Sequence, residues 1–216
     1  MAIFQPFCFL EKKTIEAKAT YIITSMQFSR NYYPKWPLDA SRVAEFLNLD
    51  VVWDSLPPDE KGTIAARILP LQRLIEINEN IPKLQGAFGE STIAHEIGHW
   101  VLHINQETVE RHTRLQQKGI NIPVQPLICR NNSESQGREW QAQYFASCLL
   151  MPQYMLVKLQ EGKDLTNWSH LYEMAEQLGV TISNLTHRLK DLDWIRIPEN
   201  SKQIELGTEN LLIANS

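Results

Sequence analysis

Three of the six histidines in this 216-residue chain lie in one short stretch, each four residues from the next: His95, His99 and His103. Residues four apart on a helix lie one above the other on the same face, so His95 and His99 can direct two imidazoles at one ion. Zinc accepts imidazole nitrogen at about 2.0–2.1 Å, and Glu96 can take a proton from a water that the metal binds. The His-Glu-x-x-His pattern therefore indicates a zinc hydrolase, with a buried helix that carries structural histidines as the alternative.

A catalytic zinc site needs a third protein ligand. His103 lies eight residues after His95, which places it about 12 Å further along a straight helix, too far to share one ion. We therefore expect His103 to bond to backbone or solvent near the end of its helix. Glu139 is the better candidate because it opens a second strongly helical segment, and two histidines with one glutamate are a standard catalytic zinc set. The alternative for Glu139 is a solvated glutamate in a first helical turn.

The residues that follow Glu139 support this interpretation. Ala142 is small enough to let its helix pack closely on the histidine helix. Gln143 shares a face with Glu139 and can hold a ligand histidine through a hydrogen bond. Candidates for stabilising the oxyanion of a hydrolytic reaction are left open. They are Tyr144, His103, His112 and Tyr154.

Together the two segments resemble the ImmA/IrrE family of bacterial metallo-endopeptidases, over about 37–192. That family joins a His-Glu-x-x-His helix to a Glu-x-x-Ala-Asn/Asp-x-Phe-Ala helix that ends in Leu-Leu-Met-Pro. The matching positions of the second helix are Glu139, Ala142, Phe145, Ala146, Leu149, Leu150, Met151 and Pro152. The chain departs from the pattern at Gln143, where Asn or Asp is usual, and 104–137 is long for the family.

The resemblance implies a gluzincin-like fold with zinc held by His95, His99 and Glu139, and Glu96 as general base. Manganese or another divalent ion is left open, since metal choice in cells depends partly on supply. The resemblance also implies a substrate class, helix-turn-helix transcriptional repressors, whose cleavage releases the genes that they silence. The alternative is a non-catalytic, metal-containing regulator that binds DNA or a repressor. A broad cytosolic peptidase fits less well, because no second lobe large enough to wall a peptide cleft is evident.

The elements that must position these residues are helices around a small sheet. Apolar periodicity predicts helices and an N-cap at Asp39, while β-branched runs predict three strands. Helices are expected over Leu10–Met26, 38–49, Ser91–His103 (after a break at Gly89 and a cap at Ser91 or Thr92), 106–119 and 138–152. Strands are expected over Leu49–Asp54, 63–70 and 73–80, the last half-buried. We expect 120–137 to be loop, and the end of the chain to be a surface strand or loose tail.

These elements give an α+β class: a mostly helical zinc-peptidase fold, a small three-stranded sheet and a helix-turn-helix-like C-terminal part. The expected division is a metallopeptidase core over 1–152, a helical module over 153–195 and a tail over 196–216. The helical module contains two short helices joined by a turn at Gly179. Between Asp164 and Trp194 there are five acidic and two basic residues. Direct DNA binding is therefore not expected, since it depends on cations that neutralise phosphates.

Composition agrees with a globular enzyme. Hydrophobic residues make up 43% of the chain and charged residues 21%, and the formal net charge is −4. No secretory signal and no run of about 18 apolar residues is evident, so we expect a cytoplasmic protein that does not enter a membrane. The three cysteines have no spacing typical of a metal knuckle or a disulfide framework.

Overall fold

The computed structural model of the chain describes every residue except 1, 61, 85, 121–122, 130–135 and 209–216. The predicted α+β class is confirmed by its eight α-helices, a four-stranded mixed sheet and a small hairpin. The helices are α1 (Lys12–Gln27), α2 (Ala40–Phe46), α3 (Ala87–His103), α4 (Gln106–Gln117), α5 (Gln136–Leu150), α6 (Gln153–Gln160), α7 (Trp168–Leu178) and α8 (Ile182–Asp191). The strands are β1 (Asp50–Asp54), β2 (Ala66–Leu69), β3 (Leu74–Asn78), β4 (Leu127–Cys129), β5 (Ile195–Arg196) and β6 (Glu205–Leu206).

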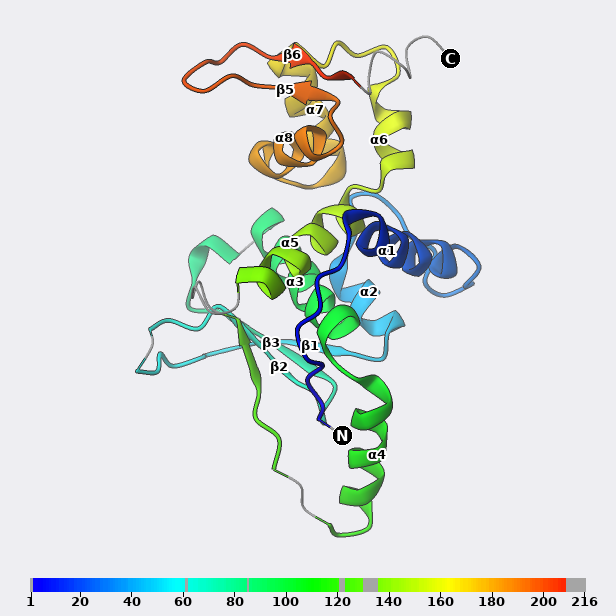
Figure 1. Cartoon of the computed structure of the whole chain (residues 1–216), viewed down its shortest axis with the longest axis vertical. Coiled ribbons are helices and arrows are strands. Elements are labelled where there is room, and N and C mark those ends of the chain that lie inside the picture. The colour runs from blue at the N-terminus through cyan, green and yellow to red at the C-terminus, as the bar shows by residue number, and fades with distance from the viewer. Residues whose placement is uncertain (1, 61, 85, 121–122, 130–135, 209–216) are drawn as a thin grey trace.

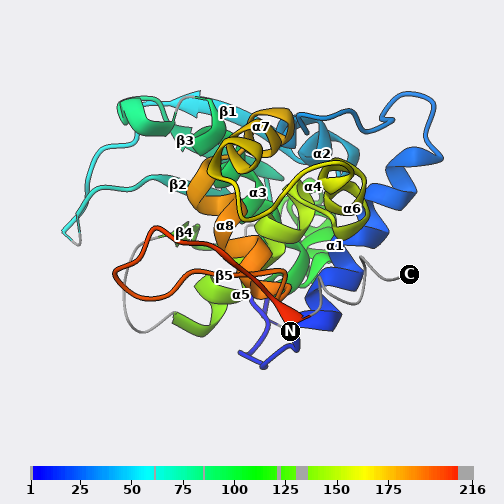
Figure 2. The ribbon, with the colours of Figure 1, turned by 90° about the horizontal axis from the view of Figure 1, so that it is seen from above.

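The molecule is layered (Figure 1). Helices α3 and α5 cross in the middle, the sheet lies on one side of them, and α6, α7, α8 and the β5–β6 hairpin lie on the other. From above, α7 and α8 cover α3 (Figure 2). None of the described helices combines the length and apolarity that crossing a lipid bilayer requires.

The sheet has the strand order β1-β3-β2-β4, with β1 and β3 parallel and the other pairs antiparallel. Strand β4 lies in the stretch that we expected to be loop, and it brings the sheet to four strands. It is only three residues long and pairs with β2 across a wide sequence interval, Ala66 opposite Cys129. Local composition does not reveal such a pairing, because a short edge strand depends on its neighbour more than on its own propensity.

Strand β3 is buried on both faces, although its alternating sequence predicts a half-buried strand. Ile75 and Ile77 are fully buried, and the polar side chains between and after them are also covered. Glu76 forms an ion pair with Arg67, its partner across the β2–β3 pair. Asn78 donates to the backbone carbonyls of the chain ahead of β2. The polar face is therefore closed by specific partners, which satisfy the buried groups.

Two predicted helices near the start of the chain, α1 and α2, are confirmed. The expected stripe of α1, which runs from Ile15 to Met26, is buried. The side chain of Asp39 accepts a hydrogen bond from the backbone N–H of Arg42 and caps α2, as its position predicts.

Helix α3 begins four residues earlier than predicted. Gly89 does not break the chain and lies inside the helix, where an added Cβ would come within 2.2 Å of the Leu84 carbonyl oxygen and 3.1 Å of the Trp53 ring. The glycine permits this close approach, so the predicted break and the predicted caps at Ser91 or Thr92 are wrong. The residue before the helix is Gly86, with a φ of 66°.

The C-terminal layer contains the two predicted short helices, α7 and α8. Gly179 ends α7 with a φ of 68°, and the Thr181 hydroxyl accepts from the backbone N–H of Asn184 to cap α8. Helix α6 is an addition to the predicted elements, and it starts directly after Pro152. The chain after α8 forms the β5–β6 hairpin. The division into a core, a module and a tail stays a prediction.

Candidate metal centre

The crossing of α3 and α5 brings two backbones into direct contact. An added Cβ on Gly98 would lie 2.9 Å from the carbonyl oxygen of Ala142, 3.0 Å from its Cα and 3.2 Å from the Phe145 ring. Only glycine fits at position 98, because the nearest atoms belong to the facing main chain. The close packing expected of Ala142 is therefore present, and it sets the distance over which side chains of the two helices meet.

Side chains from both helices converge beside this crossing. The Nε2 atoms of His95 and His99 lie 3.1 Å apart. Glu139 Oε2 lies 3.0 Å from His95 Nε2, and Glu139 Oε1 lies 3.4 Å from His99 Nε2. Among the described residues these three form the group of His, Cys, Asp and Glu side chains able to share one ion. The structure thus brings together the three residues that the sequence nominates as ligands.

The spacing of this cluster fits a small tetrahedral cation. Ligand atoms held about 2.0–2.1 Å from a tetrahedral zinc lie about 3.3 Å from one another. The three separations in the cluster are 3.0, 3.1 and 3.4 Å. Two imidazole nitrogens and a carboxylate oxygen are also donors that zinc accepts. The residues therefore fit the metal in both spacing and chemistry.

The electrostatics of the cluster make Glu139 an anion at neutral pH. Burial alone would raise its pKa, but hydrogen bonds with His95 and His99 and their charges lower the pKa of Glu139 to about 2. Burial alone would lower the pKa of His95, yet its hydrogen bond with Glu139 and the nearby charges of Glu96 and Glu139 raise it. The anionic form of Glu139 and the cationic form of His95 thus stabilise each other.

A buried chain of hydrogen bonds fixes the orientation of His99. The Gln141 amide nitrogen donates to the Cys8 carbonyl at 3.0 Å, so its oxygen accepts from His103 Nε2, also at 3.0 Å. Burial lowers the pKa of His103 to about 4, so this imidazole is neutral near pH 7 and carries one N–H. Its Nδ1 then accepts from His99 Nδ1 at 3.0 Å. The remaining nitrogen of His99, Nε2, is the one that faces His95 and Glu139.

These hydrogen bonds show that the expectation for His103 is wrong. It is 5% exposed and bonds to the side chains of His99 and Gln141, not to backbone or solvent. The reason is that α3 stays buried through its last turn. Gln141 was missed because it lies two residues from Glu139 and does not share its helix face, so helical spacing gives no signal. Its full burial is evident only from the structure.

Glu96 lies next to the cluster. Its side chain is almost fully buried, at 1% exposure, and it lines the same cavity of about 300 Å³ as His95 and Glu139. We call this space the cluster cavity; its polar wall also includes Gln143 and Asn184. Gln143 lines the cavity beside His95 and adds to the causes that raise the pKa of that histidine, so it can act on His95 despite its length.

The four oxyanion candidates lie outside the described lining of the cluster cavity. His103 is hydrogen-bonded to His99 and Gln141. Tyr144 makes a 3.3 Å contact with Arg188, and Tyr154 hydrogen-bonds to Gln27. His112 lies on α4. Besides Glu139, the polar side chains that line the cavity from α5 and α8 are the amides of Gln143 and Asn184.

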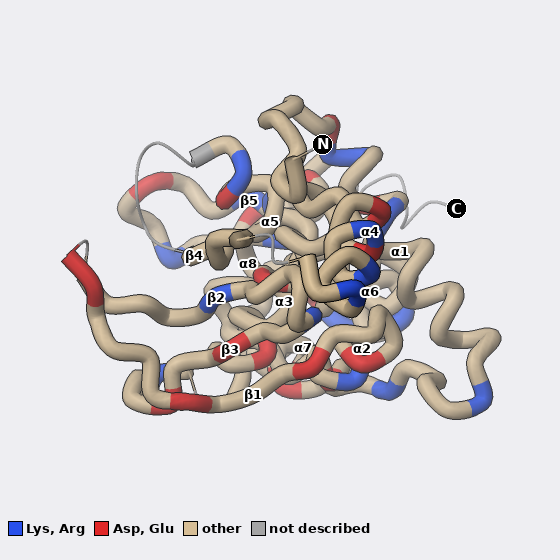
Figure 3. The backbone as a smooth tube through the Cα atoms, turned by 90° about the horizontal axis from the view of Figure 1, so that it is seen from below, with Lys and Arg blue, Asp and Glu red and all other residues tan. Residues whose placement is uncertain are grey.

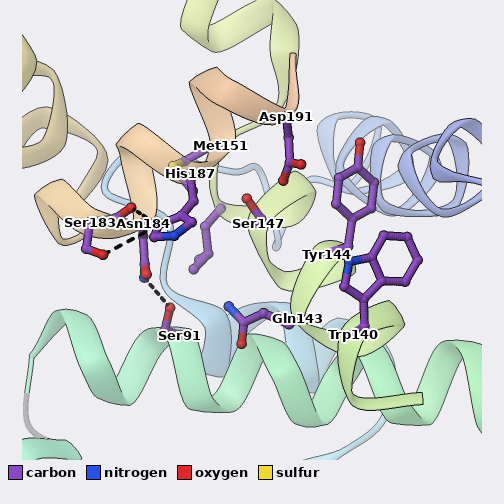
Figure 4. A pocket seen from close by; sticks show the side chains of 11 residues that line it. Ser91, Trp140, Gln143, Tyr144, Ser147, Met151, Ser183, Asn184, His187 and Asp191 are labelled. Carbon is purple, nitrogen blue, oxygen red and sulfur yellow. Dashed lines mark hydrogen bonds between the residues drawn. The ribbon is translucent and has the colours of Figure 1, made fainter. Parts of the chain in front are cut away.

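Helix α8 forms one wall of this region. Asn184 donates to the Ser91 hydroxyl at 2.8 Å, which joins α8 to the first turns of α3 (Figure 4). Arg188 is fully buried; its Nε donates to the Met151 carbonyl at 3.2 Å, and its guanidinium pairs with Glu16 on α1. Helix α8, the second helix of the turn motif, is therefore held to the core by the side chains of Arg188 and Asn184.

Two comparisons with known proteins gave matches. Residues 52–190 match the family model Peptidase_M78, described as the IrrE N-terminal-like domain. Among solved structures, a Mycobacterium tuberculosis transcriptional regulator is similar at a TM-score of 0.51 and 16% identity, over 82% of this chain and 46% of that chain. This likeness concerns the fold, and the chain spans less than half of that regulator's length. A search among curated proteins found no match.

Proposed function

The chain belongs to the ImmA/IrrE family of metallopeptidases, and from this premise we propose that it is a zinc-dependent endopeptidase that cuts a helix-turn-helix transcriptional repressor. The observation that carries the proposal is the convergence of His95, His99 and Glu139 next to Glu96 at the edge of one cavity. Family membership supports the metallopeptidase activity. The substrate class rests on the family resemblance alone.

The roles of the residues follow from their positions. His95, His99 and Glu139 would hold the cation, and zinc bound there would lower the pKa of a water and polarise the scissile carbonyl. The Glu96 carboxylate lies in the same cavity, where it takes a proton from the attacking water and later passes it to the leaving amine. The hydrogen bond from His99 to His103, which is itself bonded to Gln141, orients the ring so that His99 Nε2 faces the cluster. With a cation bound, the site would therefore combine a Lewis acid with a general base, Glu96.

A Glu96→Gln variant tests the assignment. The proteins are loaded with zinc, matched for metal content and incubated with the helix-turn-helix repressor encoded nearest the gene for this chain. Wild type is expected to cut once, and chelation should stop cleavage until zinc is restored. Glu96→Gln is expected to lose about 10²–10⁴-fold in rate, the usual contribution of general base catalysis. The exposed α4 variant Glu107→Gln is the matched control, and Glu96→Gln cleavage at the wild-type rate refutes the assignment.

The second candidate is a non-catalytic regulator, which the α7–α8 pair favours. Charge weighs against its DNA-binding form. One of the two basic residues between Asp164 and Trp194, Arg188, is fully buried and paired. Seen from below, Lys and Arg positions are mixed with Asp and Glu positions along the described backbone (Figure 3). A salt-sensitive mobility shift of duplex DNA by the isolated protein would favour this candidate over the peptidase.

A further inference from the structure

A second cavity adjoins the cluster cavity. It encloses about 400 Å³ between α5 and α8, and we call it the α5–α8 pocket. Its lining shares three residues with the cluster cavity: Ser91, Gln143 and Asn184. Figure 4 shows Asn184 reaching from α8 toward Ser91 with Gln143 beside them, while Trp140 and Tyr144 lie further along α5. The two spaces therefore meet at this polar junction.

The junction is one helical turn from the cluster. Ser91 precedes His95 by four residues and Gln143 follows Glu139 by four, so each lies about 6 Å along its helix axis from a proposed ligand. An extended peptide covers about 3.3–3.6 Å per residue. A substrate whose scissile bond lies at the cluster would therefore place a side chain one or two residues away at the mouth of the α5–α8 pocket.

The floor of the pocket is apolar. Leu150 and Met151 are 2% and 1% exposed, and the rings of Trp140 and Tyr144 are stacked with centroids 5.6 Å apart. The volume is near the lower end of the ~300–1,000 Å³ typical of small-ligand pockets, which suits one large side chain. Polar groups lie on the α8 side of the pocket, among them Ser183 and His187.

The charged groups around the pocket are already paired. Asp191 accepts from Lys12 at 2.6 Å, Lys12 also lies over the Tyr144 ring, and Arg188 is bound to Glu16. A charged substrate side chain would have to displace one of these pairs to be neutralised, whereas an apolar one needs only contact with the apolar floor. The lining therefore favours hydrophobic burial as the source of selectivity.

We propose that the α5–α8 pocket binds a large apolar side chain of the substrate, phenylalanine, leucine or methionine in type, one or two residues from the bond that is cut. The proposal rests on the proposed function, because it places the scissile bond at the cluster. It also gives α8 a role: the helix covers the pocket and so connects the turn motif to substrate choice.

Ser147 offers a way to fill the pocket without touching the cluster. It is a partly buried α5 residue of the lining, so Ser147→Leu puts an apolar side chain into the space that the substrate would use. Ser169→Leu, at an exposed α7 position outside both cavities, is the matched control. Equal melting temperatures of the two variants would show that the fold is intact.

The experiment separates binding from cleavage. Zinc-loaded Glu96→Gln protein, with and without Ser147→Leu, is panned against a phage-displayed library of random dodecapeptides. Peptides selected by the parent are expected to carry a large apolar residue at one position about tenfold or more above alanine, since one methylene in an apolar pocket discriminates by about 10–200-fold. That preference should be lost with Ser147→Leu and kept with Ser169→Leu.

Synthetic copies of the selected peptides are then incubated with zinc-loaded wild type. Cleavage within two residues of the apolar position supports the whole account. Peptides that show the preference but are not cut support the pocket while the proposed function fails. The pocket inference is overturned if no peptide is enriched above empty wells, if no apolar preference is found, or if Ser147→Leu leaves the preference unchanged.

Discussion

Helix α5 is held by two different kinds of contact. It meets α3 through Gly98 and Ala142, where backbone touches backbone and a single methyl group does not fit. It meets α8 through a long side chain, Arg188, which reaches Met151 and Tyr144 and continues to Glu16 on α1. The first contact is fixed by shape and leaves almost no freedom. The second depends on hydrogen bonds that a flexible side chain makes.

This difference matches what each contact positions. The α3–α5 crossing places the three cluster side chains, whose atoms must be within a few tenths of an ångström of the right separation. The α5–α8 contact covers a pocket for which we propose a role in substrate choice, where small adjustments cost less. Disturbing the first contact should therefore damage both stability and cation binding, while disturbing the second should damage stability and selectivity but leave cation binding unchanged.

The largest expected effect comes from removing the ligand that only α5 supplies. Glu139→Ala should weaken zinc binding by more than 100-fold, beyond the ~10–100-fold that loss of an outer partner costs. Competition with a chromogenic chelator measures the dissociation constant. Glu107→Ala, on exposed α4, should bind zinc as wild type does. Unchanged affinity in Glu139→Ala would mean that the two helices do not share one ion.

The next largest effect tests the shape of the first contact. Gly98→Ala should lower the free energy of unfolding by about 3 kcal/mol, at the upper end of overpacking costs, because the facing backbone cannot move aside. Denaturant unfolding measures this change. The second substitution Ala142→Gly should not rescue it, since the clash involves backbone oxygen and Cα. Rescue by Ala142→Gly would show that side-chain volume, and not backbone approach, sets the crossing.

Arg188→Met tests the second contact. Loss of the buried guanidinium should cost about 2 kcal/mol of unfolding free energy, less than the ~3–5 kcal/mol of a fully buried pair because Glu16 stays about a quarter exposed. Zinc affinity should not change, and the exposed neighbour Lys190→Met should leave both quantities as in wild type. Weaker zinc binding by Arg188→Met would show that the two contacts are not independent.

The smallest expected effect tests the hydrogen bonds through which Gln141 and His103 position His99. Gln141→Leu should weaken zinc binding about tenfold, the lower end of outer-partner effects, because it acts through His103. Gln141→Glu keeps an acceptor for His103 Nε2–H and should restore most of the affinity. Equal weakening by both variants would assign Gln141 a packing role only.

The contact between α3 and α5 could be predicted from the sequence better than the contact between α5 and α8. Helical spacing indicates which side chains share a face. For this reason the sequence predicts the His-Glu-x-x-His helix, the role of Glu139 and the close packing at Ala142. The stripe of α1 and the Asp39 cap are local features and are confirmed for the same reason. The candidate site could therefore be predicted from residues that are close in sequence, once the two helical motifs were taken as a pair.

What could not be predicted depends on contacts between distant segments. His103 finds Gln141 only after α3 and α5 have packed, and Gln141 reaches Cys8 across 133 residues. Strand β4 forms because β2 offers it an edge. Arg188 is buried although charged side chains are rarely so, because α1, α5 and the residue directly after α5 provide its partners.

The central claim is that His95, His99 and Glu139 hold one cation between α3 and α5. A crystal structure of the zinc-loaded protein, with anomalous data collected on both sides of the zinc absorption edge, tests it directly. We predict one anomalous peak about 2.0–2.2 Å from both Nε2 atoms and from an oxygen of Glu139. A peak bound elsewhere, or bound to the histidines with Glu139 turned away, would contradict the account.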